Sequence, residues 1–140
     1  MRRIRIFLIL CVIATGFCFG QLPHTFTQYT SEDGLSQNTI MSILQDDKGV
    51  MWFATWDGLY KFDGYTFNNY KAHPGDSIGL SNNRLDNIKE DRYGYIWVQS
   101  YNHQVYRFNP RLERFQAIPY DNYLSLDMYV LPCGDVWIIT

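Results

Sequence analysis

The sequence contains little cysteine and little histidine. Of its 3 cysteines, two fall within the first 20 residues, and only Cys133 lies beyond them. A single cysteine can form neither an intrachain disulfide nor a cysteine-based metal site. The histidines His24, His73 and His103 are isolated, without the spacing of metal ligands. We therefore expect no metal and no cofactor, and a fold that is stabilised by its core alone.

Positive charge and catalytic motifs are also scarce. Three of the 12 basic residues lie at the extreme N-terminus, so that 9 basic residues face 14 acidic ones in the remainder, a net charge of about −5. Without a basic cluster, contact with nucleic acid is not expected. Neither a phosphate-binding glycine loop nor a Gly-x-Ser-x-Gly motif is present. The adjacent carboxylates Asp46-Asp47 and Glu90-Asp91 favour solvated turns over a catalytic or calcium site, and we expect no enzymatic activity in this chain.

Residues 1–20 have the pattern of a secretory signal peptide. An arginine-rich start precedes the apolar run Ile6–Ala14, and small residues follow up to Gly20. The apolar run is short for a membrane span, although an uncleaved anchor is the alternative. The pattern predicts export to the periplasm of a Gram-negative cell, with cleavage after Gly20.

Beyond the leader, one short segment recurs three times. Each copy reads Gly, any residue, apolar, Trp, apolar, any residue, Ser or Thr, and the tryptophans are spaced by 45 and 40 positions. The copies are Gly49–Thr55, Gly94–Ser100 and Gly134–Thr140. β-Branched and aromatic residues after a turn-forming glycine predict a strand, and a period of this length predicts a repeat architecture.

The repeat extends well beyond this strand. The first unit predicts four strands, at Ile40–Gln45, Met51–Thr55, Leu59–Phe62 and Thr66–Tyr70. Asp-Gly pairs at Asp57-Gly58 and Asp63-Gly64 are typical of the turns that join such strands. Four antiparallel strands per unit are the blade of a β-propeller, so the predicted fold is all-β.

The predicted blades do not complete a ring. Residues 21–34 would form a lone outer strand (Phe26–Tyr29) and a linker, residues 35–78 the first blade, residues 79–120 the second, and residues 121–140 half of a third. A propeller needs about four to eight blades. Residues 21–140 are therefore expected to be an incomplete β-propeller that needs further blades of a longer chain, or a second copy, and that self-associates when isolated.

The combined motifs resemble the two-component regulator propeller repeat. They are Gly-Leu-Ser-x-Asn, Ile-x-x-Asp-x-x-Gly-x-x-Trp-x-x-Thr/Ser, Gly-Leu-Tyr-Lys-Phe-Asp-Gly and Phe-x-x-Tyr, within Thr25–Thr140. The resemblance implies the periplasmic sensor region of a hybrid two-component system, as in Bacteroidetes. In that family a linker domain, a membrane helix, a histidine kinase, a receiver and a DNA-binding domain follow, and none of these is in this sequence. Membrane attachment would come only through such a C-terminal part.

Repeated and variable positions suggest different roles. The repeated Trp52, Trp97 and Trp137 are expected to be buried core residues that pack blade against blade. The loops between the second and third strands differ between units, and loops on a rigid scaffold commonly carry binding sites.

The first of these loops holds Trp56 and Asp57, and the second holds Tyr101, Asn102 and His103. An aromatic plane beside amide or carboxylate groups suits sugar binding, so these five residues are the candidate ligand site, with an ordinary hairpin as the alternative. The predicted function is periplasmic sensing of a ligand, a glycan or oligosaccharide. The alternatives are a fragment of a secreted propeller glycosidase or lyase, and an interaction module or truncated product without independent activity.

Overall fold

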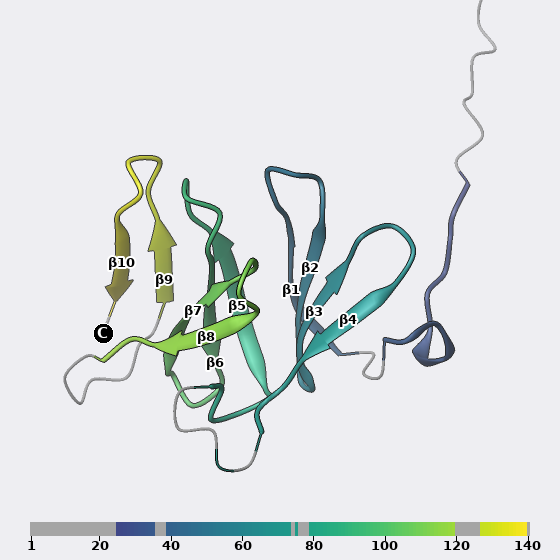
Figure 1. Cartoon of the computed structure of the whole chain (residues 1–140), viewed down its shortest axis with the longest axis horizontal. Coiled ribbons are helices and arrows are strands. Elements are labelled where there is room, and N and C mark those ends of the chain that lie inside the picture. The colour runs from purple at the N-terminus through teal and green to yellow at the C-terminus, as the bar shows by residue number, and fades with distance from the viewer. Residues whose placement is uncertain (1–24, 36–38, 74, 76–78, 120–126, 140) are drawn as a thin grey trace, which may run out of the picture.

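In the computed structural model, residues 25–35, 39–73, 75, 79–119 and 127–139 are described, and they form three antiparallel sheets (Figure 1). The first sheet has the order β1-β2-β3-β4, the second β5-β6-β7-β8, and the third pairs β10 with β9. The strands are β1 Ile40–Gln45, β2 Met51–Thr55, β3 Gly58–Phe62, β4 Phe67–Tyr70, β5 Leu85–Glu90, β6 Ile96–Ser100, β7 Val105–Asn109, β8 Arg114–Ala117, β9 Asp127–Val130 and β10 Val136–Ile139. Blades of four antiparallel strands are thus confirmed, with β1 and β2 at the predicted bounds.

The first turn of each sheet has the same backbone geometry. In the first sheet, Gly49 donates its N–H to the carbonyl of Asp46 at 2.9 Å, and Asp46 donates to Val50 at 2.9 Å. Gly49 has φ +82°, a conformation that favours glycine. The corresponding glycines, Gly94 and Gly134, also have positive φ. The recurring glycine in the sequence therefore marks a required turn conformation.

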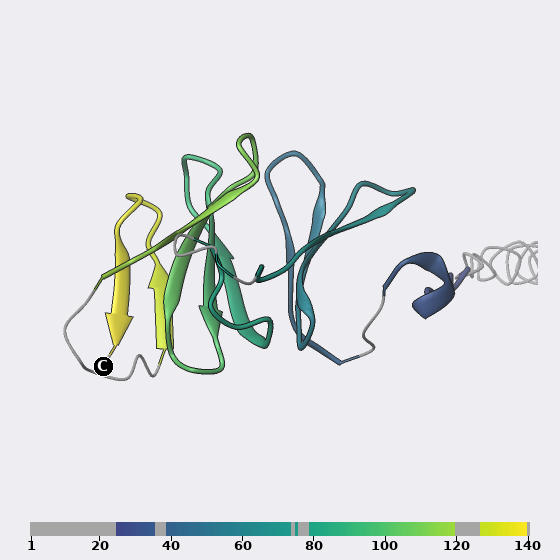
Figure 2. The same ribbon diagram turned by 60° about the horizontal axis from the view of Figure 1, so that its bottom comes forward.

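The three sheets stand face to face, and the first two share a core (Figure 2). Leu59 of β3 and Ile88, Ile96 and Phe108 of the second sheet are among its buried members. The indole of Trp52 packs against the ring of Phe108, with centroids 5.6 Å apart. Burial of apolar surface between adjacent sheets is the main source of stability for such a stack.

The three repeated tryptophans differ in burial, which corrects part of the expectation for them. Trp52 is 1% exposed, Trp97 is only half-buried, and Trp137 is 64% exposed. Trp52 faces the four-stranded second sheet, whereas the equivalent face of the second sheet meets only the two-stranded pair β9-β10. Trp137 lies on β10, beyond which no described residue packs. The burial of each tryptophan therefore depends on how many strands pack against its face of the sheet.

The strand predicted at Phe26–Tyr29 is absent from the structure. Residues 25–30 are irregular, and a short 3₁₀ helix, η1 (Ser31–Asp33), follows them. Tyr29 contacts the first sheet through its side chain, with its ring 5.0 Å from Phe62 and 5.6 Å from Phe67. Its backbone pairs with no described strand, so the segment lacks the hydrogen bonds that would make it one.

The predicted leader at residues 1–20 lies outside the described residues. So do residues 36–38, 74, 76–78, 120–126 and 140. Within the described ranges, no helix has the length and apolar character needed to cross a bilayer.

Candidate functional site

Two turns and one connecting segment meet at one end of the first two sheets. The β2–β3 turn holds Trp56, the β6–β7 turn holds Tyr101, and Asn83-Arg84 lead into β5. Gly58, at the end of the first turn, donates its N–H to the carbonyl of Asn83 at 2.9 Å. Tyr101 donates its N–H to the carbonyl of Arg84 at 2.9 Å. The connecting segment therefore bridges two turns that are about one repeat apart in sequence.

The side chain of Arg84 lies between the two predicted aromatic residues. The guanidinium carbon is 4.2 Å from the ring centre of Trp56 and 3.7 Å from that of Tyr101. Both rings keep part of their surface exposed. Such contacts are favourable because the electron-rich face of a ring attracts a cation. The structure thus brings Trp56 and Tyr101 together around a cation.

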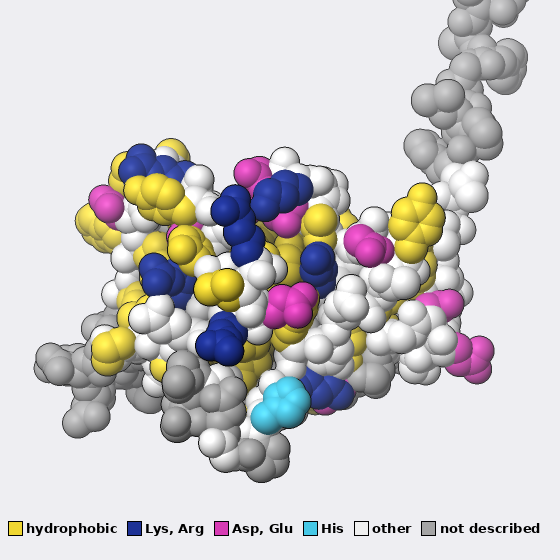
Figure 3. Space-filling model, viewed as in Figure 1, with side chains coloured by type: hydrophobic (Ala, Val, Ile, Leu, Met, Phe, Trp, Pro, Cys, Tyr) yellow, Lys and Arg dark blue, Asp and Glu magenta, His cyan; other side chains and the backbone are white. Residues whose placement is uncertain are grey.

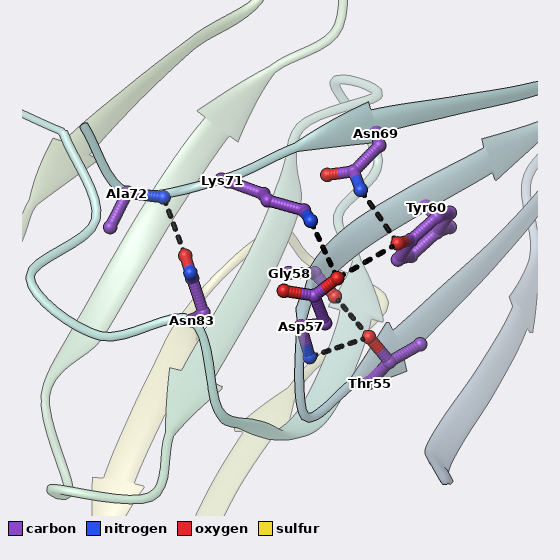
Figure 4. A network of polar contacts seen from close by, with 8 residues as sticks. All are labelled: Thr55, Asp57, Gly58, Tyr60, Asn69, Lys71, Ala72 and Asn83. Carbon is purple, nitrogen blue, oxygen red and sulfur yellow. Dashed lines mark hydrogen bonds and ion pairs between the residues drawn. The ribbon is translucent and has the colours of Figure 1, made fainter. Parts of the chain in front are cut away.

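The predicted ligand residue Asp57 is engaged in a polar network (Figure 4). Its Oδ2 forms an ion pair of 2.5 Å with Nζ of Lys71, and it accepts a longer hydrogen bond of 3.4 Å from the hydroxyl of Tyr60. Asn69 donates to the same hydroxyl at 2.6 Å. The hydrogen bond with Asp57 raises the pKa of Lys71, so that this ammonium stays charged. The carboxylate is thereby committed to holding β3, β4 and the following segment together.

Hydrogen bonds between side chains and the backbone also stabilise this region (Figure 4). The hydroxyl of Thr55 donates to the carbonyl of Gly58 at 3.0 Å and accepts the N–H of Asp57 at 3.0 Å. The side-chain carbonyl of Asn83 accepts the N–H of Ala72 at 2.6 Å. The bonds of Thr55 hold the turn that carries Trp56, and the bond of Asn83 joins the segment before β5 to the segment after β4.

The second turn is built differently. Asn102 accepts a hydrogen bond of 2.6 Å from the hydroxyl of Ser100, and its amide nitrogen donates to Ser81 at 3.4 Å. His103 has φ +64° and donates its N–H to the carbonyl of Ser100 at 2.8 Å. This turn therefore presents Tyr101 with an amide and an imidazole beside it.

A cleft of about 430 Å³ adjoins the network on the outer side of the sheets. Its lining includes Asn69, Lys71 and His73, on β4 and just after it, and Glu113 and Arg114, where β8 begins. Such a volume is within the range of ligand pockets. Lys71 is therefore shared between the cleft and the ion pair with Asp57.

Arg84 was not among the predicted site residues. In the alignment of the first two repeats it meets Thr39, so no motif singles it out. The sequence offers one indication of its role: a basic residue stands directly before the first strand of the second blade, and that end of the blade also carries the turns with the aromatic residues.

The turn carboxylates have structural roles. Asp46 accepts the indole N–H of Trp52, and Asp91, which is buried, accepts that of Trp97. The expectation of solvated turns is therefore wrong for Asp91. Nor does any cluster of three or more metal-ligating side chains occur among the described residues.

Comparison with protein families identifies the repeat. Residues 34–57 match the family described as "Two component regulator propeller". A 56-residue segment is 48% identical to "Histidine kinase P4" of Formosa agariphila, and this segment covers 40% of the chain and 4% of that relative.

Two solved structures resemble the chain in three dimensions. The first is the extracellular domain of the hybrid two component system BT3049 from B. thetaiotaomicron: it has a TM-score of 0.71 and 26% identity over 84% of this chain and 18% of that one. PorZ of the type-IX secretion system of Porphyromonas gingivalis has a TM-score of 0.57 and 18% identity over 71% of this chain and 15% of that one, a likeness of fold alone. The chain spans less than a fifth of each relative.

Proposed function

We propose that this chain, a two component regulator propeller protein, is a ligand-sensing extracellular segment of a hybrid two component regulatory system. The observation that carries the proposal is its likeness to the extracellular domain of BT3049, which extends over 84% of the chain. The 48% identity to a segment of a histidine kinase supports the same class. We propose no catalytic role for this segment itself.

We further propose that the segment works outside the cytoplasm. Its first 20 residues have the composition of a signal peptide, and cleavage after Gly20 would leave the repeats in the periplasm. Intact-mass measurement of the exported protein tests this, because a product that retains Arg2 to Arg5 would contradict it.

The ligand that suits the site is an oligosaccharide. Trp56 and Tyr101 offer partly exposed rings, on which the apolar face of a sugar can stack. Asn102 lies beside Tyr101; besides its bonds to Ser100 and Ser81, its amide has a second N–H and a second lone pair that can pair with a sugar hydroxyl, and His103 follows in the same turn. The remaining partners we propose are further blades of a longer sensor chain or a second copy.

A propeller glycosidase or lyase fits these residues less well. Such an enzyme commonly needs carboxylates that are available for proton transfer or nucleophilic attack. Asp57, the carboxylate nearest to the two rings in sequence, is committed to Lys71.

Binding of oligosaccharides to the purified chain tests the proposal. The protein would be recovered from the periplasm of a Gram-negative host and titrated with neutral and acidic oligosaccharides, with calorimetry as the readout. We expect binding that Trp56→Ala abolishes. Trp137→Ala is the matched control, since it removes an exposed tryptophan outside these turns. Equal affinity of the Trp56→Ala variant and the wild type would contradict this site.

A further inference from the structure

We infer that Arg84 recognises an acidic group of the ligand, a carboxylate or a sulfate ester carried by an oligosaccharide. This inference rests on the proposed function and adds to it a class of ligand and a specificity-determining residue.

The first observation is that Arg84 is held in one position. Its guanidinium lies between two rings, at 4.2 Å from Trp56 and 3.7 Å from Tyr101. Its backbone is also fixed, because its carbonyl accepts the N–H of Tyr101 and its own N–H donates to Asn82 Oδ1 at 2.9 Å. An arginine side chain loses much rotamer freedom when it is ordered. Here the fold has already restricted it, so a ligand would meet a preorganised group.

The second observation is that, among the described residues, Nε of Arg84 has no hydrogen-bonding partner. Within the part of the chain that the structure describes, Nε of Arg84 is the one buried side-chain nitrogen or oxygen without a hydrogen bond. A ring face attracts the cation but offers no hydrogen-bond acceptor, so the two ring contacts do not satisfy Nε. Burying a donor without an acceptor is costly, and native proteins generally avoid it. Arg84 as a whole is only partly buried, and we take the missing acceptor to be one that a ligand supplies to its guanidinium.

The third observation is that no carboxylate of the site neutralises Arg84. Asp57, next to Trp56 in the same turn, pairs with Lys71 instead. Other arginines that stack on rings do have partners: Arg107 lies over Tyr95 and donates to Gln116 at 2.7 Å. Within the described part of the chain, Arg84 differs from Arg107 because its buried Nε lacks such an acceptor.

An anionic group on a sugar meets these requirements. The guanidinium presents a planar fork of donors that matches the two oxygens of a carboxylate or sulfate. The aromatic rings on both sides of Arg84 can contact the sugar that bears this group. A neutral oligosaccharide would stack on the rings but would leave the charge of Arg84 unpaired.

The decisive experiment compares charged and neutral forms of the same oligosaccharide. Calorimetric titrations of the full chain would use tetragalacturonate and its methyl ester, and a sulfated galactan tetrasaccharide and its desulfated form. A titration with inorganic sulfate alone shows whether the site binds a free anion or only an anion that is attached to a sugar. The variants are Arg84→Met, which removes the charge, and Arg84→Lys, which keeps the charge without the planar fork. Arg107→Met is the matched control.

We expect one charged tetrasaccharide to bind about tenfold or more tightly than its neutral form, the scale of one charge-assisted contact. If the galacturonate binds, the recognised group is a carboxylate; if the sulfated galactan binds, it is a sulfate ester. Arg84→Met should abolish the difference, Arg84→Lys should keep part of it, and Arg107→Met should leave it unchanged. The preference should also weaken as salt is added.

Four outcomes overturn the inference, and they differ in what they mean for the proposed function. Equal affinities for charged and neutral forms, an unchanged preference in Arg84→Met, or binding of inorganic sulfate alone would refute a role for Arg84 in recognising an acidic sugar. Binding that still depends on Trp56 would then leave the proposed function intact. Failure of every oligosaccharide to bind would refute both. The comparison of charged and neutral forms with wild-type protein decides the matter even if a variant does not fold.

Discussion

Asp91 accepts a hydrogen bond at Oδ2 from the indole Nε1 of Trp97, at 2.7 Å, and its Oδ1 accepts the backbone N–H groups of Tyr93 and Tyr95. The first repeat has the same arrangement, in which Asp46 accepts the indole of Trp52 at 2.9 Å. The turn aspartate and the strand tryptophan are six positions apart in both. They form one structural unit, in which the carboxylate satisfies both the turn and the indole.

Removing this carboxylate should destabilise the second blade. Asp91→Ala would leave the indole N–H of Trp97 and two turn N–H groups without their acceptor, at a cost of about 1–3 kcal/mol. Urea denaturation monitored by tryptophan fluorescence would measure it. Asp135→Ala is the control, because Asp135 is exposed in the corresponding turn of the third sheet. Equal losses in the two variants would contradict a structural role specific to Asp91.

The third repeat departs from this unit. Leu131 occupies the position of the aspartate, although the backbone turn is retained: Gly134 donates to the carbonyl of Leu131 at 2.8 Å. Trp137 therefore has no equivalent acceptor, and it is also 64% exposed. The indole N–H is hydrogen-bonded to the turn aspartate in the two repeats whose tryptophan is at least partly buried, and the repeat with the exposed tryptophan lacks that aspartate.

The three tryptophans should consequently contribute unequally to stability. Trp52→Ala removes a side chain that is buried against Phe108 and should cost about 3–5 kcal/mol. Trp97→Ala should cost less, and Trp137→Ala should have little effect. Thermal or urea denaturation of the three variants would rank them. A loss for Trp137→Ala as large as that for Trp52→Ala would show that exposure does not determine their contributions.

The local elements were predictable because their signals are local. Turn glycines, alternating apolar residues and the repeat period gave the bounds of β1 and β2 as the structure has them. Burial of the tryptophans was not predictable in the same way, because it depends on how much sheet lies opposite each one. The segment from the turn glycine to the Ser or Thr follows one pattern in all three repeats and cannot distinguish three environments; only Leu131 in place of the aspartate sets the third repeat apart.

The site was predictable in part. Trp56 and Tyr101 were expected on equivalent loops, but their joint contact with Arg84 depends on the path of the segment between the sheets. The role of Asp57 was also hidden, since Lys71 lies 14 positions away. Contacts of this kind arise from the packing of separate segments, for which a single sequence carries no direct signal.

Gly58 should be among the least replaceable residues of the site. It has φ +116°, and a Cβ there would lie 2.5 Å from the backbone carbonyl oxygen of Tyr70. Gly64 has a similar φ of +99° but open space around it, so Gly64→Ala should show only backbone strain, of about 1–3 kcal/mol. Gly58→Ala should cost more than this and should also weaken ligand binding through Trp56. Denaturation of the two variants separates the clash from the strain, and equal losses would contradict the clash.

Glu90 should make stability depend on pH. Burial raises the pKa of its carboxyl above the ordinary value of 4.5, although the N–H of Asp47 donates to it at 3.0 Å. A raised pKa means that the folded state binds the proton more tightly, so this contribution is complete below pH 4.5 and is lost as the pH rises through the folded pKa. Glu90→Gln should therefore raise the melting temperature relative to wild type at pH 7 and not below pH 4.5. The difference between the two melting curves across pH tests this, and a difference that grows on acidification would contradict the sign.

The third sheet should make the isolated chain self-associate. Tyr129 and Trp137 are directly paired across β9 and β10, and Ile139 lies two positions further along β10, so all three share one face. All three are exposed, and Figure 3 shows apolar side chains at this end of the molecule. Within the described residues, β10 pairs on one edge only, which leaves the other edge open to a strand of another copy.

We expect residues 21–140 to form concentration-dependent oligomers in size-exclusion chromatography with light scattering. Trp137→Lys should shift the protein toward monomer, because a charge in the middle of this face opposes its burial against another copy. Leu112→Lys is the matched control: Leu112 is 67% exposed, as Trp137 is 64% exposed, but it lies in the turn before β8, away from the open sheet. A monodisperse monomer for the unmodified chain, with a sharp cooperative melt, would show that two four-stranded blades and one strand pair satisfy their own surfaces. An equal shift with Leu112→Lys would instead attribute the association to general surface hydrophobicity.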